Sequence, residues 1–110
     1  MKVSSYSDSE SVEEVKGVSR RDVITADDGA PLVCMQLFEI SPNASTPTHY
    51  HPWEHEVFIV SGTGMVVGEQ GSVPIGQSNI VFIPASEPHC FVNTGSETLR
   101  FICVEPLKRE

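Results

Sequence analysis

Residues 48–62 read Thr-His-Tyr-His-Pro-Trp-Glu-His-Glu-Val-Phe-Ile-Val-Ser-Gly and contain three of the four histidines of the chain. His49 and His51 are two positions apart, so on an extended backbone both rings leave the same face. His55 has the same odd parity and opens the apolar run at residues 57–60. This segment therefore predicts a β-strand preceded by a row of histidines on one face.

On both sides of this segment, short apolar runs alternate with breaks that contain Gly, Pro, Asn and Ser. Strand-length runs rich in Val, Ile and Phe, separated by turn residues every 8–12 positions, are typical of a β-sandwich or β-barrel. No window sustains a helical apolar stripe, and no internal repeat is visible. The sequence predicts an all-β domain. The runs are residues 23–24, 32–40, 56–60, 64–67, 80–83, 90–92 and 99–104.

Composition limits the classes of protein to be considered. The chain has 110 residues and a formal charge of −8, which fits one domain and disfavours binding to nucleic acid or to anionic membranes. No apolar run approaches the roughly 20 residues of a membrane span, and we see no signal-peptide core. Three cysteines without a CxxC pair argue against a disulfide framework and favour a cytoplasmic location. We expect residues 1–16 to be a polar arm or a loosely docked edge segment, and residues 17–110 to form the barrel.

The histidines predict a metal site. The fourth, His89, precedes the short strand expected at residues 90–92, so all four imidazoles converge if this strand faces the one that follows His55. Neutral imidazole suits Mn, Fe, Co, Ni, Cu and Zn, whereas Ca and Mg prefer oxygen ligands. Four histidines in so short a chain favour a shared ion over surface or core histidines.

Two motifs resemble those of the cupin superfamily. His49-x-His51-x3-His55-x6-Gly62 resembles the first cupin motif, and Pro84-x-Ser86-x2-His89-x3-Asn93 resembles the second. Asn43 and Ser86 occupy positions where the motifs have glycine. The resemblance spans residues 18 to 107 and is greatest to small single-domain cupins that bind manganese through four histidines. It implies a double-stranded β-helix, or jelly-roll barrel, and a divalent metal ion, with Mn expected first and then Fe, Zn or Ni.

The main departure from the motif is at its glutamate ligand, where this chain has His55. Glu56 is the alternative ligand if the longer spacing is used. Gly62 decides between them, because it follows His55 by the seven positions that the motif requires, and the parity of Glu56 turns it away from His49 and His51. We therefore expect His49, His51, His55 and His89 to be the ligands, with Glu56 either orienting an imidazole or lying at the surface.

Other residues are expected near the metal. Cys103 and Phe101 share the parity of Leu99 and should face inward, so Cys103 is either a pocket residue or a buried structural cysteine. Trp53 either caps the pocket or packs under a loop. No acidic or lysine side chain is placed on the histidine face by this reasoning.

Residues 57–60 are apolar on both faces and need cover from the arm or a second subunit. The resemblance implies a homodimer.

The resemblance also implies a function. As an enzyme, the protein is expected to catalyse a metal-dependent (Mn or Fe) oxidation of a small organic molecule, as dioxygenase-type cupins do. Two alternatives stay open: a non-catalytic module whose metal anchors a ligand or staples the barrel, and a cupin-type isomerase or decarboxylase. Whether the protein is an enzyme at all is not decided by these residues.

Overall fold

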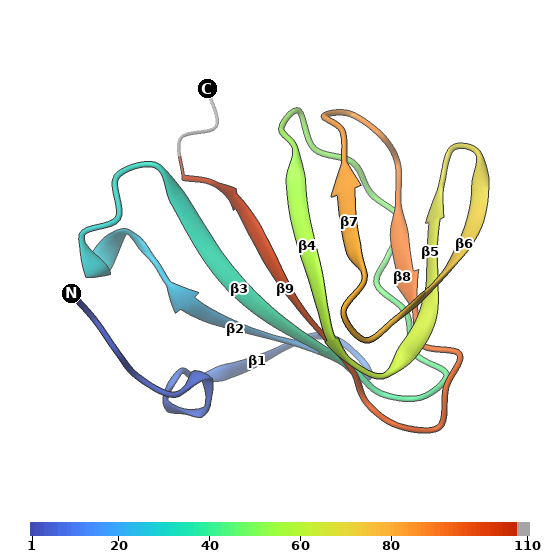
Figure 1. Ribbon diagram of the computed structural model, residues 1–110, viewed down its shortest axis with the longest axis horizontal. Helices are drawn as coiled ribbons and strands as arrows, with labels where there is room; N and C mark the ends of the chain where they lie inside the picture. The colour runs from blue at the N-terminus through green and yellow to red at the C-terminus, as the bar shows by residue number, and fades with distance from the viewer. Residues whose placement is uncertain (108–110) are drawn as a thin grey trace.

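The computed structural model describes residues 1–107 and confirms the all-β prediction (Figure 1). Short 3-10 turns lie at Tyr6–Asp8 and Ala26–Asp28. In the described part of the chain, no helix has the length and apolarity to cross a membrane. The strands are β1 (Ser11–Val15), β2 (Val18–Ile24), β3 (Val33–Ile40), β4 (His55–Ser61), β5 (Thr63–Gly68), β6 (Gly71–Gly76), β7 (Ile80–Ile83), β8 (Cys90–Val92) and β9 (Leu99–Pro106).

The strands form two antiparallel sheets of the jelly-roll type. The larger has six strands in the order β1-β2-β3-β9-β4-β7, and the smaller has three in the order β6-β5-β8. Figure 1 shows the large sheet curving away from the small one towards β1 and β2. Where the sheets face each other, Ile59, Leu99 and Phe101 of the large sheet form a core with Ile75 and Phe91 of the small sheet.

Strand β4 has the alternation that the sequence predicts. His55, Val57 and Ile59 are buried, whereas Glu56 and Phe58 are exposed on the outer face. Strand β9 alternates in the same way over its whole length. Because the two strands pair directly, their buried side chains form one inward-facing surface.

The segment expected to be an arm is partly in the sheet. Ser11–Val15 forms β1, which pairs with β2 at the edge of the large sheet and is exposed along its length. In the segment that precedes β1, the ring centroid of Tyr6 lies 5.7 Å from Cζ of Arg21 and 5.9 Å from Cζ of Arg100. The domain boundary at residue 16 stays a prediction.

The motif turns have the backbone conformations that glycine usually provides. Asn43 and Ser86, which replace motif glycines, have φ angles of 69° and 70°. Gly62 has φ 89°, and a Cβ placed there would lie 2.6 Å from the carbonyl oxygen of Thr98. This turn therefore requires glycine both for its positive φ angle and for the close approach of the backbone at Thr98 and Leu99.

Candidate functional site

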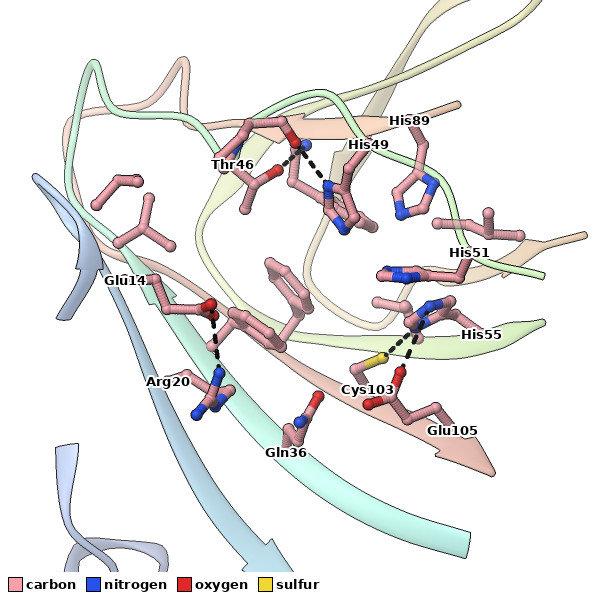
Figure 2. A pocket seen from close by; sticks show the side chains of 18 of the residues that line it. Glu14, Arg20, Gln36, Thr46, His49, His51, His55, His89, Cys103 and Glu105 are labelled. Atoms are coloured by element: carbon pink, nitrogen blue, oxygen red, sulfur yellow. Dashed lines mark hydrogen bonds and ion pairs between the residues drawn. The ribbon is translucent and has the colours of Figure 1, made fainter. Parts of the chain in front are cut away.

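A cavity of about 690 Å³ lies on the inner side of the large sheet. All four histidines line it, and Figure 2 shows them gathered at one end, with Glu14, Arg20 and Gln36 away from them. The ring centroids of neighbouring histidines are 4.6 Å apart for His49 and His51, 4.8 Å for His49 and His89, and 4.7 Å for His51 and His55. The predicted convergence of the four imidazoles is therefore what the structure has.

Three of the histidines are close enough to share one ion. Ring nitrogens of His49, His51 and His89 all lie within 4.8 Å of one another. His49 and His89 are also joined through their backbones, with N–H to carbonyl hydrogen bonds of 3.1 and 2.9 Å in the two directions. This bridge brings the first motif to the start of β8, and it fixes two candidate ligands relative to each other.

Backbone carbonyls select which nitrogen of two histidines is free. Nδ1 of His49 donates to the oxygen of Pro47 at 2.7 Å, and Nδ1 of His89 donates to the oxygen of Glu87 at 2.9 Å. Because a carbonyl oxygen only accepts, Nδ1 carries a proton in both rings, so in the neutral form of each ring the lone pair is on Nε2. Burial lowers the pKa of His89, which keeps this ring neutral at pH 7.

His55 lies beside this group of three and is held differently. Its Nδ1 is 3.0 Å from Sγ of Cys103, and its Nε2 is 3.5 Å from Oε2 of Glu105. Among the described residues, Nε2 is buried without a hydrogen-bond partner. Burial lowers the pKa of His55 to about 4, although the carboxylate of Glu105 acts in the opposite direction. That His55 is the fourth ligand stays a prediction.

Glu105 corrects the expectation that no acidic side chain lies on the histidine face. It is buried at the inward-facing end of β9 and lines the cavity. The sequence reasoning followed the parity of β9 as far as Cys103, and one more step of two residues would have reached Glu105. It was missed because a carboxylate is rarely buried unless it is paired.

The other predicted pocket residues separate into two groups. Cys103, Phe101 and Trp53 all line the cavity, and burial raises the pKa of the Cys103 thiol to about 12, so the thiol is protonated at neutral pH. Glu56 does not line this cavity and lies on the outer face of β4, which is the surface position that the sequence analysis left open. A hydrogen bond to the Glu54 side chain raises the pKa of Glu56.

The family follows from a match over most of the barrel. The model of the cupin domain family matches residues 36–105, which include both histidine motifs. The chain belongs to the cupin family. Small cupins with this barrel commonly hold a divalent metal, and the histidine cluster at the cavity is where this cupin would hold one.

One solved structure resembles this cupin along nearly its whole length. The polyketide cyclase RemF from Streptomyces resistomycificus is 38% identical, with a TM-score of 0.91, and the alignment covers 99% of this chain and 81% of that chain. A comparison with curated protein sequences finds no significant match.

More distant structures share the fold alone. A predicted oxalate decarboxylase from Thermotoga maritima is 23% identical with a TM-score of 0.82, over 97% of this chain and 100% of that chain. A sugar phosphate isomerase from Silicibacter pomeroyi is 21% identical with a TM-score of 0.74, over 84% of this chain and 61% of that chain. The barrel is therefore common to cupins of different activities.

The residues present fit a divalent transition metal. The ligand atoms that converge are imidazole nitrogens, and in the neutral forms of His49 and His89 the backbone hydrogen bonds leave the lone pair on Nε2. The buried Nε2 of His55 lacks a hydrogen-bond partner among residues 1–107. It is therefore a further ligand atom, and a bound ion would give it a partner. Such a set suits Mn, Fe, Ni or Zn better than Ca or Mg.

Proposed function

We propose that this cupin is a metal-dependent cyclase that closes carbon–carbon rings in a linear poly-β-ketone. The observation that carries the proposal is the 38% identity, over 99% of the chain, to a polyketide cyclase. In this proposal His49, His51, His55 and His89 hold a divalent ion, with Mn expected first and then Fe, Zn or Ni. A bound ion would act as a Lewis acid towards a substrate carbonyl oxygen.

The cavity supports this class of substrate by its size and walls. At about 690 Å³ it lies within the range of small-molecule sites. Phe38 stacks on Phe101 at 5.2 Å between centroids, and Phe101 stacks on Phe91 at 4.5 Å. These rings form an apolar wall beside the histidines, against which flat enol segments or newly closed rings of the substrate would pack.

The register of the large sheet gives the cavity its length. Arg20 of β2 pairs with Phe38, Phe38 with Phe101, and Phe101 with Ile59 of β4. Three steps between strands, each about 4.8 Å, separate Arg20 from β4 by about 14 Å. This length suits an extended chain or a few fused rings more than a compact metabolite.

The end of the cavity far from the histidines is polar but not cationic. Arg20 makes ion pairs with Glu14 at 3.3 Å and with Asp22 at 3.1 Å, so one positive charge faces two negative charges. The guanidinium of Arg20 offers hydrogen-bond donors, and the carboxylates of Glu14 and Asp22 offer hydrogen-bond acceptors. We infer that it suits neutral keto, enol or hydroxyl groups better than a carboxylate.

Ring closure of this kind is an aldol reaction. A methylene carbon between two carbonyls loses a proton and bonds to a third carbonyl carbon, whose oxygen gains a proton; loss of water then gives the unsaturated ring. The cavity residues hold the chain bent against the phenylalanine wall, so that one of several competing closures is favoured. No external oxidant is needed.

The test compares product profiles. Linear poly-β-ketones released by a reconstituted polyketide synthase are incubated in three parallel reactions: with metal-loaded wild-type protein, with His49→Ala, and without protein. An oxygen electrode records oxygen uptake in each reaction. We expect wild type to enrich one product whose mass is that of the substrate less water, without oxygen uptake. Oxygen uptake coupled to product would instead support the dioxygenase-type oxidation that the sequence suggested, and product profiles identical to the protein-free control would contradict an enzymatic function. A cytoplasmic location belongs to this proposal, since the substrate is made inside the cell.

A further inference from the structure

The buried carboxylate of Glu105 lies in the cavity wall between two aromatic side chains. It is 6% exposed and occupies the last inward-facing position of β9. It accepts a hydrogen bond from Nε1 of Trp53 at 3.0 Å, and its Oε2 lies 3.5 Å from Nε2 of His55. Figure 2 shows the carboxylate directed towards His55. Glu105 thus reaches the histidine cluster from a strand outside both cupin motifs.

Trp53 extends this contact to a second histidine. Its indole stacks on the ring of His51, with centroids 4.7 Å apart and planes at 16°. The hydrogen bond to Glu105 fixes the rotation of the indole, and the stacked indole in turn limits the rotation of His51. One carboxylate therefore lies against His55 directly and restrains His51 through Trp53.

The charge of the site gives the carboxylate a second effect. Four neutral imidazoles would leave a bound divalent ion with its full charge of +2, at a site where His55 and His89 are buried while His49 is exposed. A nearby carboxylate lowers the cost of placing the ion there. In the first cupin motif this anion comes from the glutamate ligand, a position that His55 occupies in this chain.

We propose that Glu105 is a positioning residue and the anionic partner of the metal centre. It orients His51 through Trp53, it places a negative charge beside His55, and it replaces from β9 the negative charge that the motif has lost on β4. This inference rests on the proposed metal site, but not on the identity of the substrate.

The test measures metal binding. Glu105→Gln keeps the shape of the side chain and removes its charge, and Glu56→Gln is the matched control on the outer face of β4. Calorimetric titration of the metal-free proteins with Co²⁺ and Mn²⁺ is expected to show affinity about 10- to 100-fold weaker in Glu105→Gln and unchanged in Glu56→Gln. The visible absorption of bound Co²⁺ should also shift in Glu105→Gln, because the ligand field changes.

Trp53, the one tryptophan of the chain, gives a second readout. Its emission should change when wild type binds metal, because it stacks on a ligand, and the change should be smaller in Glu105→Gln. Trp53→Phe keeps a ring for stacking but loses the donor to Glu105, so it should lose part of the affinity. This variant keeps the proposal testable if Glu105→Gln does not fold.

The outcomes separate this inference from the proposed function. If wild type binds no metal, the proposed metal centre fails and Glu105 has no such role. If wild type binds metal while Glu105→Gln matches it in affinity and Co²⁺ spectrum, the role of Glu105 is overturned and the metal centre stands. Weaker binding in Glu105→Gln with an unchanged Co²⁺ spectrum and an unchanged Trp53 response would also contradict positioning.

Discussion

His55 and Glu56 are adjacent in the chain and face opposite ways on β4, His55 into the cavity and Glu56 into solvent. This difference decides which of them could contribute to the proposed metal centre. The pleat of one strand thus separates two residues that spacing alone leaves as competing candidates.

We predict that His55→Ala weakens metal binding far more than Glu56→Ala. The first change removes a buried nitrogen beside the other histidines, whereas the second removes an exposed carboxylate on the far face. Calorimetric titration with Mn²⁺ measures both. Equal losses, or a larger loss in Glu56→Ala, would mean that the wrong residue of the pair was assigned to the site.

The stability of the metal-free protein should depend on pH through His55. Its pKa falls from the ordinary 6.5 to about 4 on folding, so below pH 6.5 the unfolded chain binds a proton that the folded chain does not. The free energy of unfolding is therefore expected to be insensitive to this group above pH 6.5 and to fall from pH 6.5 towards pH 4. Urea titrations of wild type and His55→Gln test this between pH 7.5 and 5. A wild-type free energy of unfolding that falls no more steeply with decreasing pH than that of His55→Gln would contradict the assignment.

Glu105 marks the limit of what the sequence predicts at this scale. Parity along β9 correctly predicts that Cys103 and Phe101 face the cavity, and the same parity applies to Glu105. What the pattern does not contain is the partner that makes a buried carboxylate acceptable. Trp53 and His55 lie 52 and 50 positions away in the chain and meet Glu105 only through the pairing of β4 with β9.

Among the elements, most strands were predicted, but β2 (Val18–Ile24) was predicted only at residues 23–24. Runs at residues 32–40, 80–83, 90–92 and 99–104 correspond to β3, β7, β8 and β9. The edge strands β1 and β6 were missed. Strand β1 is exposed throughout, so its residues carry no apolar alternation, and β6 contains Pro74 between its two apolar residues.

The turn between β4 and β5 gives a prediction at the scale of elements. Gly62 and Gly71 both have positive φ, but a Cβ at Gly62 would lie 2.6 Å from Thr98 O and 2.8 Å from Leu99 Cα, whereas one at Gly71 meets nothing within 4 Å. Both alanine variants share the cost of the φ angle. We expect Gly62→Ala to lower the free energy of unfolding by about 1–3 kcal/mol more than Gly71→Ala, as measured by urea denaturation. Equal losses of unfolding free energy in the two variants would mean that the start of β9 shifts to accommodate the added methyl group without further destabilisation.

For the whole molecule, the uncovered part of the large sheet bears on assembly. Phe58, Ile80 and Phe82 are 47%, 80% and 60% exposed on the outer face of the adjacent strands β4 and β7. The N-terminal segment lies elsewhere, with Tyr6 against Arg21 and Arg100. Of the two covers that the sequence suggested for this face, a second subunit therefore stays the proposal.

We predict a homodimer that buries this face. Light scattering after size-exclusion chromatography should give twice the chain mass for wild type and the monomer mass for Phe82→Glu. Val73→Glu on β6, at an exposed position of the small sheet, is the control and should stay dimeric. A monomeric wild type at micromolar concentration would contradict the prediction.

With a formal charge of −8, the surface of the molecule is also expected to bind neither nucleic acid nor anionic vesicles.

The central claim is that four histidines from two motifs make one metal centre in this barrel. Elemental analysis of untagged protein, purified without chelator, tests it most directly, with wild type compared with the His49→Ala, His51→Ala and His89→Ala variants. We predict close to one divalent transition-metal ion per wild-type chain, with Mn the first expectation, and a marked loss in each variant. Wild type that holds no metal, even after incubation with Mn²⁺, Fe²⁺, Zn²⁺ and Ni²⁺ in turn, would contradict the claim.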